Sequence, residues 1–440
     1  MIAKSHRSPR VVAPPCASIV VGVLLGVALL LLPTAVDSFV SRLPPPPPPS
    51  ASIFFNVAPP NPTSTTTITT TSPMSSSRSS SRSSDFDFVY THLEGNGQIW
   101  QITHRPSDVR RRRRRRPPVD YDDEDEDDDD DGGGGRGGMG GGTAASSLSI
   151  VVDPLAYQLD FGVPWGYRAN KRVVSERDTL DAICDARPSH CLLTMGLDDH
   201  AHARTLSELC RRLPGLKFVV APSCVDKLST ITNDDDGGGG GGGLPRDDVD
   251  PDRVTVLEHD RTHDISSDDG DGDVDVVATI TATRGALVGP PWQRRENGYL
   301  MELSSRDDDD DDGRRLGIYY EPHGDAVLDD VRMLRANIVI SPVIEQSLPA
   351  QLPPWARYTL VHGGERTLRI AEALRADVIL PLGNGELDIE GPLSGLVASS
   401  GSVDEFEMLV KRRNMERASF DDRRIEVMRT MPGVPLTVMI

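Results

Sequence analysis

The sequence predicts a layered α/β sandwich, because strand-like segments come first as a hairpin and later alternate with helix-like segments. Phe86–Thr91 and Gln98–Thr103 are two β-strand candidates joined by a turn that contains Gly95, Asn96 and Gly97. Further along the chain, short apolar runs alternate with amphipathic segments. An early hairpin followed by β–α units is typical of a layered sandwich rather than of a purely parallel sheet.

The remaining elements follow from the same patterns. The other strand candidates are short apolar runs, namely Ser147–Asp153, Cys191–Met195, Lys217–Ala221, Val254–Leu257, Val274–Thr283, Gly298–Leu303, Leu316–Tyr320, Asn337–Ser341 and Asp377–Pro381. Helices are expected at Ala203–Leu213, Ala326–Leu334, Glu365–Ala376 and Val403–Arg412. The last helix begins with Ser402 and Glu405 at the spacing of a capping box, which satisfies the first backbone amides of a helix.

Low-complexity tracts make the folded part shorter than the chain. Only 37% of the 440 residues are hydrophobic, whereas Gly and Pro together number 75. Such tracts bury too little apolar surface to offset their ordering entropy. We therefore expect one domain over residues 86–440, with disordered inserts near 105–145, 233–250, 264–273 and 306–313. The first insert is expected to be an enlarged hairpin loop.

The charge pattern does not indicate a nucleic-acid partner. The formal net charge of −20 would become +4 without the 24 carboxylates of the acidic tracts, and −3 if the seven arginines Arg110–Arg116 were also removed. These arginines are followed within a few residues by eleven carboxylates, which would compete with nucleic acid for them. The folded part is nearly neutral, so the overall charge says little about its partner.

The first 85 residues are typical of a targeting region. Residues 1–40 combine a basic start with an apolar stretch, Ala17–Leu32, as in a secretory signal. Residues 41–85 are rich in Ser, Thr and Pro, as in a transit peptide. With Phe39 at the junction, the region resembles the bipartite plastid presequences of algae with secondary plastids. The alternative is a secreted protein, or one anchored in a membrane by uncleaved residues 17–32.

A polar turn after one strand candidate carries possible metal ligands. Cys191–Met195 leads into Asp198, Asp199 and His200, with His202 two residues later. Carboxylate oxygen and imidazole nitrogen both suit zinc, so these side chains are candidate ligands at a strand-to-helix turn. The alternative is a solvated helix start with Asp199 as the N-cap.

Several segments together resemble the metallo-β-lactamase superfamily. They are Val151–Pro154, Cys191–Thr194 followed by Asp199 and His200, Tyr319–His323, and Ala376–Pro381. Val288–Tyr299, with its Trp-Gln-Arg run, and the later Tyr-Glu-Pro-His resemble the plastid members of plants and algae in the branch of the ascorbate-phosphate lactonases. The resemblance implies a four-layered αββα sandwich of the metallo-β-lactamase type.

The sequence departs from the metal motif of that superfamily, His-x-His-x-Asp-His. Met195 and Leu197 stand at the first two histidine positions, and Leu382 stands where the final histidine is expected. The resemblance therefore implies a reduced site with Asp199, His200 and His323 as ligands, and His202 as an alternative to His323. Such a site would hold one divalent metal (zinc, iron or manganese), or none.

Other residues are candidates for roles at such a site if a metal binds. Asp198 or Glu321 would serve as general base. Trp292, Arg294, Arg295 and Asn297 would bind a small anionic molecule, since an aromatic surface beside guanidinium groups suits an anionic or planar ligand. The alternative is a Pro-rigidified loop that packs Trp292 into the core.

Two hypotheses about function remain open at this point. One is a metal-dependent, hydrolase-like protein of the plastid that acts on a small anionic molecule. The other is a non-catalytic binding or interaction protein that kept the fold and lost hydrolysis, because a fold does not fix an activity. The sequence does not specify the oligomeric state.

Overall fold

The computed structural model describes residues 86–104, 147–231, 253–266, 276–289, 292–305, 315–351, 357–383, 387–418 and 423–439. The predicted targeting region, residues 1–85, lies outside these residues. So do most of the four predicted inserts, together with the acidic tracts that they contain. Within the described residues, two seven-stranded sheets form the centre of the molecule.

The first sheet combines an antiparallel half with a parallel half. Its order is β19-β1-β2-β3-β5-β6-β7, in which β19 to β3 are antiparallel and β3 to β7 are parallel. The strands are β1 (Phe86–His92), β2 (Gln98–His104), β3 (Ser147–Val152), β5 (His190–Leu193), β6 (Lys217–Val220), β7 (Val254–Val256) and β19 (Pro435–Val438). The early hairpin and the later β–α units were both predicted from the sequence.

The second sheet is built in the same way. Its order is β18-β15-β12-β11-β10-β9-β8, antiparallel from β8 to β11 and parallel from β11 to β18. The strands are β8 (Thr262–Ser266), β9 (Val276–Arg284), β10 (Asn297–Ser305), β11 (Leu316–Tyr320), β12 (Ile338–Pro342), β15 (Val378–Leu382) and β18 (Glu426–Val427).

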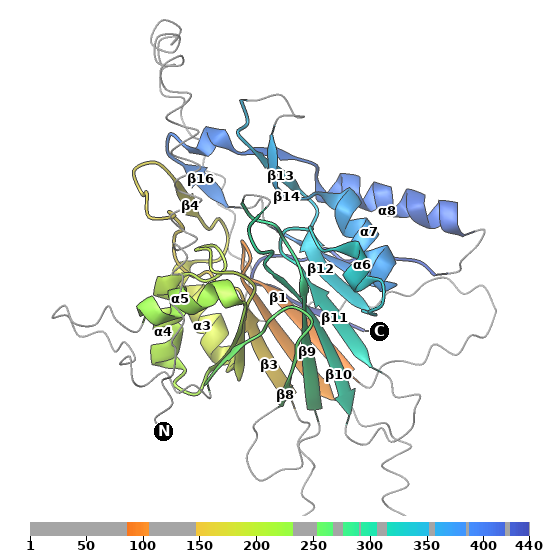
Figure 1. Ribbon diagram of the computed structural model, residues 1–440, viewed down its shortest axis with the longest axis horizontal. Coiled ribbons are helices and arrows are strands. Elements are labelled where there is room, and N and C mark those ends of the chain that lie inside the picture. Colours follow the sequence, from red (N-terminus) through yellow and green to blue (C-terminus); the bar gives the residue numbers. More distant parts are fainter. Residues whose placement is uncertain are drawn as a thin grey trace, which may run out of the picture.

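Helices cover the outer face of each sheet, which gives four layers (Figure 1). On the first sheet lie α3 (Glu176–Ala186), α4 (Ala203–Arg212) and α5 (Val225–Ile231); on the second lie α6 (Leu328–Val331), α7 (Gly364–Leu374) and α8 (Val403–Arg417). The Ser402 side chain caps α8 by accepting from the Glu405 amide, as its spacing predicted. The predicted four-layered αββα sandwich is confirmed.

Alternating side chains fill the three interfaces between these layers. In β5, Leu192 belongs to the core between the sheets, whereas Cys191 and Leu193 pack under the helices of the first sheet. Continuous apolar runs are expected for strands that are covered on both faces. Trp100 of β2 and Tyr320 of β11 meet edge to face across the central core, with ring centroids 6.0 Å apart.

Smaller elements lie at one end of the sandwich. β13 (Glu345–Leu348) joins β14 (Tyr358–Val361) and β17 (Ala398–Ser400), and β4 (Arg168–Asn170) pairs with β16 (Asp388–Glu390). Two short 3-10 helices are η1 (Pro222–Cys224) and η5 (Ser394–Leu396). None of these small elements was predicted, because strands of three or four residues carry little periodicity.

Some predicted boundaries were wrong. Residues 262–266 form β8, which pairs with β9 and was not predicted; residues 264–266 had been assigned to an acidic insert. The helix expected over Ala326–Leu334 is a single turn, α6, after which the chain turns to enter β12. The expected hairpin around the first insert is confirmed, because Thr103 pairs with Ser147 on either side of it. Among the described residues, no helix has the length and apolar character needed to span a membrane.

Candidate metal centre

Three polar side chains that follow two different strands converge at one end of the sandwich. Asp199 and His200 follow β5 of the first sheet, and His323 follows β11 of the second. One ligand atom from each lies within 4.8 Å of the others. His200 is fully buried and His323 is 5% exposed, whereas the Asp199 side chain is 25% exposed. The group is therefore held in the interior and reaches solvent at Asp199.

The His200 ring is fixed by a buried carboxylate. Its Nδ1 lies 2.8 Å from Oδ2 of Asp153, which also accepts hydrogen bonds from the Thr194 hydroxyl at 2.6 Å and the Tyr320 hydroxyl at 2.9 Å. Oδ1 of Asp153 accepts from the Thr194 amide at 2.9 Å. With Nδ1 donating to Asp153, Nε2 faces Asp199 and His323. A histidine ligand held in this way is common in metal sites.

The His323 ring is oriented in the same manner by a backbone oxygen. Its Nδ1 donates to the carbonyl of Leu360 at 2.8 Å, and its Nε2 lies 3.2 Å from Nε2 of His200. The two rings stack with centroids 5.3 Å apart. The turn that carries His323 is closed by the Glu321 carboxylate, which accepts from the amides of His323 at 3.3 Å and Asp325 at 2.6 Å.

The Asp199 carboxylate completes the group. Its Oδ2 lies 3.3 Å from Nε2 of His200, and its buried Oδ1 has no hydrogen-bond partner among the described residues. The Asn96 amide nitrogen lies 3.0 Å from Nε2 of His200 and 3.4 Å from Oδ2 of Asp199. A buried carboxylate oxygen without a partner is costly. Together with two anchored imidazoles, it fits a single divalent cation.

The charges of these groups are coupled. Burial alone would lower the pKa of His200, but Asp199 and Asp153 raise it to about 10. Burial, together with the charge on His200, lowers the pKa of His323 to about 4. Burial alone would raise the pKa of Asp199, but the neighbouring His200 holds it below its usual range. Near pH 7 and without metal, His323 is thus neutral and Asp199 is ionised, as a metal requires of both, whereas His200 carries a second proton that a metal ion would have to displace from Nε2.

Not every candidate from the sequence joins this group. Asp198, expected as a general base, forms an ion pair with Lys227 of α5. Glu321, the other candidate, is fully buried, which raises its pKa to about 7, and its carboxylate holds the turn around His323. His202, the alternative ligand, caps α4 by accepting from the Thr205 amide. These bonds give the three residues structural roles.

The predicted ligand-binding segment divides into two parts. Arg295 donates to the carbonyl of Gly285 and to the Asp325 carboxylate, and Asn297 is buried and donates to the carbonyl of Leu257. Trp292 is 85% exposed instead of packing into the core, and Arg294 forms a surface ion pair with Glu258. Trp292 and Arg294 therefore remain accessible, whereas Arg295 and Asn297 hold the loop in place.

Met195 and Leu197, which stand at two histidine positions of the superfamily motif, belong to a small apolar cluster. Met195 is fully buried against Ala286 and Val288, and Leu197 packs on the same cluster. Ala286 and Val288 follow β9. The cluster supplies no metal ligand.

Sequence reasoning missed two members of the site. Asp153 was noticed only as part of a strand that resembles the superfamily, yet its φ of 41° and its full burial show a constrained position. Asn96 was interpreted as a turn residue because it lies between two glycines. The signal available in the sequence for Asp153 was an acidic residue directly after an apolar strand. Nothing in the local pattern distinguished Asn96.

Comparisons with known proteins give one family model and a few similar solved structures. A family model described as a beta-lactamase superfamily domain matches residues 143–383. Among solved structures, the chain is similar to Igni18, a metallo hydrolase from the hyperthermophilic archaeon Ignicoccus hospitalis KIN4/I, with 12% identity, a TM-score of 0.39, and coverage of 80% of this chain and 98% of that chain. It is also similar to a long form RNase Z from yeast, with 8% identity, a TM-score of 0.33, and coverage of 69% of this chain and 38% of that chain.

No curated protein matches the sequence. The family model nevertheless extends over more than half of the chain and includes the strands that carry Asp153, Asp199, His200 and His323. The four-layered sandwich is the metallo-β-lactamase fold, and the chain therefore belongs to the family of β-lactamase superfamily domains.

Proposed function

We propose that this protein is a plastid hydrolase with a reduced metal site, in which Asp199, His200 and His323 hold one divalent ion. The observation that carries the proposal is the convergence of two imidazole Nε2 atoms 3.2 Å apart, each with its Nδ1 tied to an oxygen. The unpartnered Oδ1 of Asp199 supports it. Zinc, iron and manganese all accept such mixed nitrogen and oxygen ligands.

The chain's own residues would position the ion and its substrate. A bound divalent ion lowers the pKa of its water toward neutrality and polarises a carbonyl or phosphoryl oxygen. Asp153 keeps the His200 lone pair directed inward, and the partly exposed Asp199 gives access from solvent. Exposed Trp292 and Arg294 would contact a small anionic substrate, because an exposed ion pair such as Arg294–Glu258 is weak and exchanges readily.

The proposed substrate class and location rest on the sequence. The Val288–Tyr299 segment and the later Tyr-Glu-Pro-His resemble the branch of the ascorbate-phosphate lactonases, so lactones and phosphate esters are the first compounds to assay. The presequence-like residues 1–84 support the plastid. A fusion of these residues to a reporter should enter the plastid of an alga with secondary plastids, and changing Phe39 should impair import. Uniform secretion would exclude this location.

One observation favours the alternative, a binding protein without hydrolysis. Both candidate general bases are occupied, Asp198 by Lys227 and Glu321 by the amides of its own turn. In that case the site would bind a metal and an anion without turnover.

A turnover assay separates the two functions. Protein loaded with zinc, iron or manganese would be given lactones and phosphate monoesters, beside Asp199→Ala and the surface variant Asp329→Asn, whose side chain is 83% exposed. A hydrolase requires turnover by the wild type and by Asp329→Asn, with a loss of at least about 100-fold in Asp199→Ala. If the wild type binds these compounds but does not turn them over when loaded with zinc, iron or manganese, the binding protein is favoured.

A further inference from the structure

Residues 285–289 and 292–296, between β9 and β10, belong to one arm of the second sheet. Backbone hydrogen bonds close the base of this arm. The Gly285 amide donates to the Glu296 carbonyl, and the Glu296 amide donates to the Ala286 carbonyl, both at 2.8 Å. The arm therefore starts and ends at one place, beside the first residue of β10.

The arm lies at the end of the sandwich that carries the metal centre. Because β10 is antiparallel to β11, the arm and His323 adjoin neighbouring strands at the same edge of the second sheet. Ala286 and Val288 pack on Met195, which follows β5 of the first sheet. The turn with the other two metal ligands follows the same strand. The arm is therefore a neighbour of the metal centre in both sheets.

The hydroxyl of Tyr358, the first residue of β14, holds the arm beyond its base. It accepts a hydrogen bond from the Gly289 amide at 2.9 Å and donates to the Leu287 carbonyl at 2.5 Å. Gly289 has a φ of 126°, and a Cβ at this position would lie 2.1 Å from Oε1 of Gln293. The Gln293 side chain is thus packed against Gly289, which ties the residue after Trp292 to the part of the arm that Tyr358 holds.

The elements that hold the arm also hold a metal ligand. Leu360 lies two residues after Tyr358 on β14, and its carbonyl orients the His323 ring at 2.8 Å. Asp325, in the turn that carries His323, accepts a hydrogen bond from the Leu287 amide at 3.2 Å. The arm is therefore bonded to the same two elements that position this ligand.

Trp292 presents a large aromatic surface on this arm. Its side chain is 85% exposed, although the arm around it is tied at its base, at Gly289 and at Leu287. An aromatic side chain has few rotatable bonds, so it offers contact area to a ligand at a low cost in conformational entropy. Holding the segment that carries it lowers this cost further.

We infer that the arm selects ligands that carry a planar aromatic group beside their anionic group, and that Tyr358 is the positioning residue that holds Trp292 for this contact. The proposed function, on which this inference rests, places the anionic group at the metal centre and Arg294. The aromatic group would then contact the Trp292 ring in an offset-stacked or edge-to-face arrangement. Aryl compounds, rather than their methyl counterparts, are the expected ligands.

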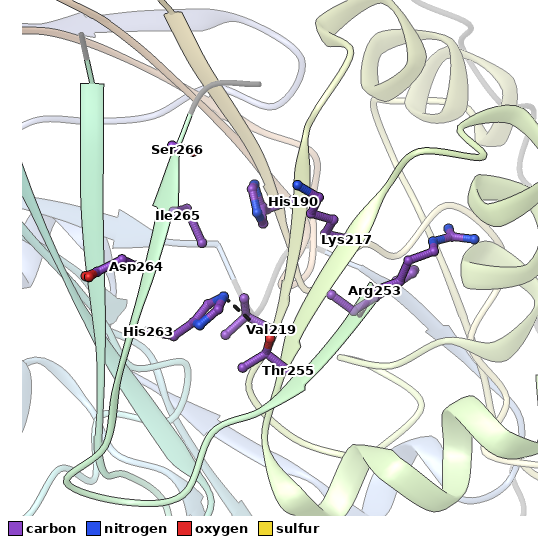
Figure 2. Close-up of a pocket in the computed structure, with 10 residues that line it drawn as sticks. His190, Lys217, Val219, Arg253, Thr255, His263, Asp264, Ile265 and Ser266 are labelled. Atoms are coloured by element: carbon purple, nitrogen blue, oxygen red, sulfur yellow. Dashed lines mark hydrogen bonds between the residues drawn. The ribbon is translucent and has the colours of Figure 1, made fainter. Parts of the chain in front are cut away.

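A hollow at the opposite end of the sandwich provides a control for binding elsewhere. It lies where β5 and β6 begin, between these strands and β8 of the second sheet (Figure 2). Its Arg253 donates to the Leu216 carbonyl at 2.9 Å, and its Thr255 hydroxyl lies 3.4 Å from Nε2 of His263. Thr255→Val changes this hollow and leaves the arm intact.

Calorimetric titration of the zinc-loaded full chain tests this inference with two pairs of anions, phenylphosphonate with methylphosphonate and benzoate with acetate. In at least one pair, the wild type should bind the aromatic member about fivefold more tightly, or better. This ratio should fall below about twofold in Trp292→Ala and by about half in Tyr358→Phe, at an unchanged zinc content. Trp165→Ala, which removes another exposed tryptophan, and Thr255→Val should keep the wild-type ratio.

The outcomes separate this inference from the proposed function. A zinc-loaded wild type that binds both members of each pair equally, or binds none of them, overturns the inference, as does a preference that Trp292→Ala keeps. A preference that Tyr358→Phe keeps in full, or a loss of zinc from this variant, overturns the positioning role of Tyr358. Preference for the aromatic anions without hydrolysis of any ester supports the inference and contradicts the proposed hydrolysis. A wild type that holds no zinc contradicts both.

Discussion

Nε2 of His200 and Nε2 of His323 lie 3.2 Å apart, although 123 positions separate the two residues in the sequence. Each ring is anchored at Nδ1, His200 by the Asp153 carboxylate and His323 by the carbonyl of Leu360. Without metal, the pKa of about 10 places a proton on Nε2 of His200, between the two rings. In the proposed site, a divalent ion takes the place of this proton, with Asp199 as the third ligand.

Asp153 should be a positioning residue for this ion. In Asp153→Asn, Oδ1 can still accept from the Thr194 amide, but the carboxylate that accepts from Nδ1 of His200 is lost. We expect zinc affinity to fall 10- to 100-fold, as for other residues that orient a histidine ligand. Competition with a chromophoric chelator measures the affinity. Asp264→Asn, a distant exposed carboxylate, is the control, and an unchanged affinity in Asp153→Asn would contradict this role.

Asn96 should become a fourth ligand when its amide is replaced by a carboxylate. Its Nδ2 lies 3.0 Å from Nε2 of His200 and 3.4 Å from Oδ2 of Asp199. In Asn96→Asp an oxygen ligand replaces this nitrogen, so zinc affinity should rise at least about tenfold. Without metal, the second carboxylate beside Asp199 should lower the melting temperature. An unchanged or lower zinc affinity in Asn96→Asp would contradict a shared ion at Asp199, His200 and His323.

These site residues differ in how far the sequence predicted them. Asp199, His200 and His323 stand directly after apolar strands, and the ends of strands in a layered sandwich bring such residues together. Asp153 and Asn96 were missed as parts of the site, because their roles depend on contacts with His200 across 47 and 104 positions. Pairings between distant residues leave no local periodicity.

The central strands were predicted more completely than the elements at the margins of the fold. Strands that are buried on both faces, such as β11 over Leu316–Tyr320, are continuous apolar runs and were predicted with the observed bounds. Helix α3 was missed because Leu180 and Ile183 are its main buried apolar residues, although Ser175 and Asp178 form a capping signal. Strand β8 was missed because its pattern of exposed polar residues merges with the acidic tract that follows.

The buried lysine Lys171 should make stability depend on pH. Its ammonium donates to the carbonyl of Leu93 at 2.6 Å and to the Thr179 hydroxyl at 2.8 Å, and burial lowers its pKa from 10.5 to about 8. Between pH 8 and 10.5 the folded lysine has lost its proton while the unfolded lysine keeps it. The unfolded chain then binds more protons, so the free energy of unfolding contributed by Lys171 rises with pH.

Denaturant unfolding at pH 7.5 and pH 10.5 measures this contribution as a difference between variants. Between these two pH values, the free energy of unfolding of the wild type should rise by about 2–3 kcal/mol relative to that of Lys171→Met, which has no titratable group at position 171. The difference in free energy of unfolding between the wild type and Lys411→Met, which removes an exposed lysine, should stay nearly constant. A wild-type advantage that falls as pH rises would show that Lys171 is stabilised in its charged form.

The first low-complexity insert should contribute little to stability. Thr103 and Ser147 are paired in an antiparallel ladder on either side of it, so the hairpin is closed by strand contacts. Deleting residues 110–142 should change the free energy of unfolding by no more than about 1 kcal/mol, since the cost of loop closure varies slowly with loop length. Thermal unfolding followed by circular dichroism is the measurement. Loss of the cooperative transition would indicate that these residues pack on the domain.

Metal content per chain tests the central claim most directly. Protein purified without added metal would be analysed by mass spectrometry, together with Asp199→Ala, His323→Ala and His202→Asn, in which the N-cap of α4 is retained. The account predicts about one divalent ion per chain in the wild type and in His202→Asn, and nearly none in Asp199→Ala and His323→Ala. A wild type that holds no ion even after incubation with zinc, iron or manganese, or an Asp199→Ala variant that keeps the full amount, would contradict it.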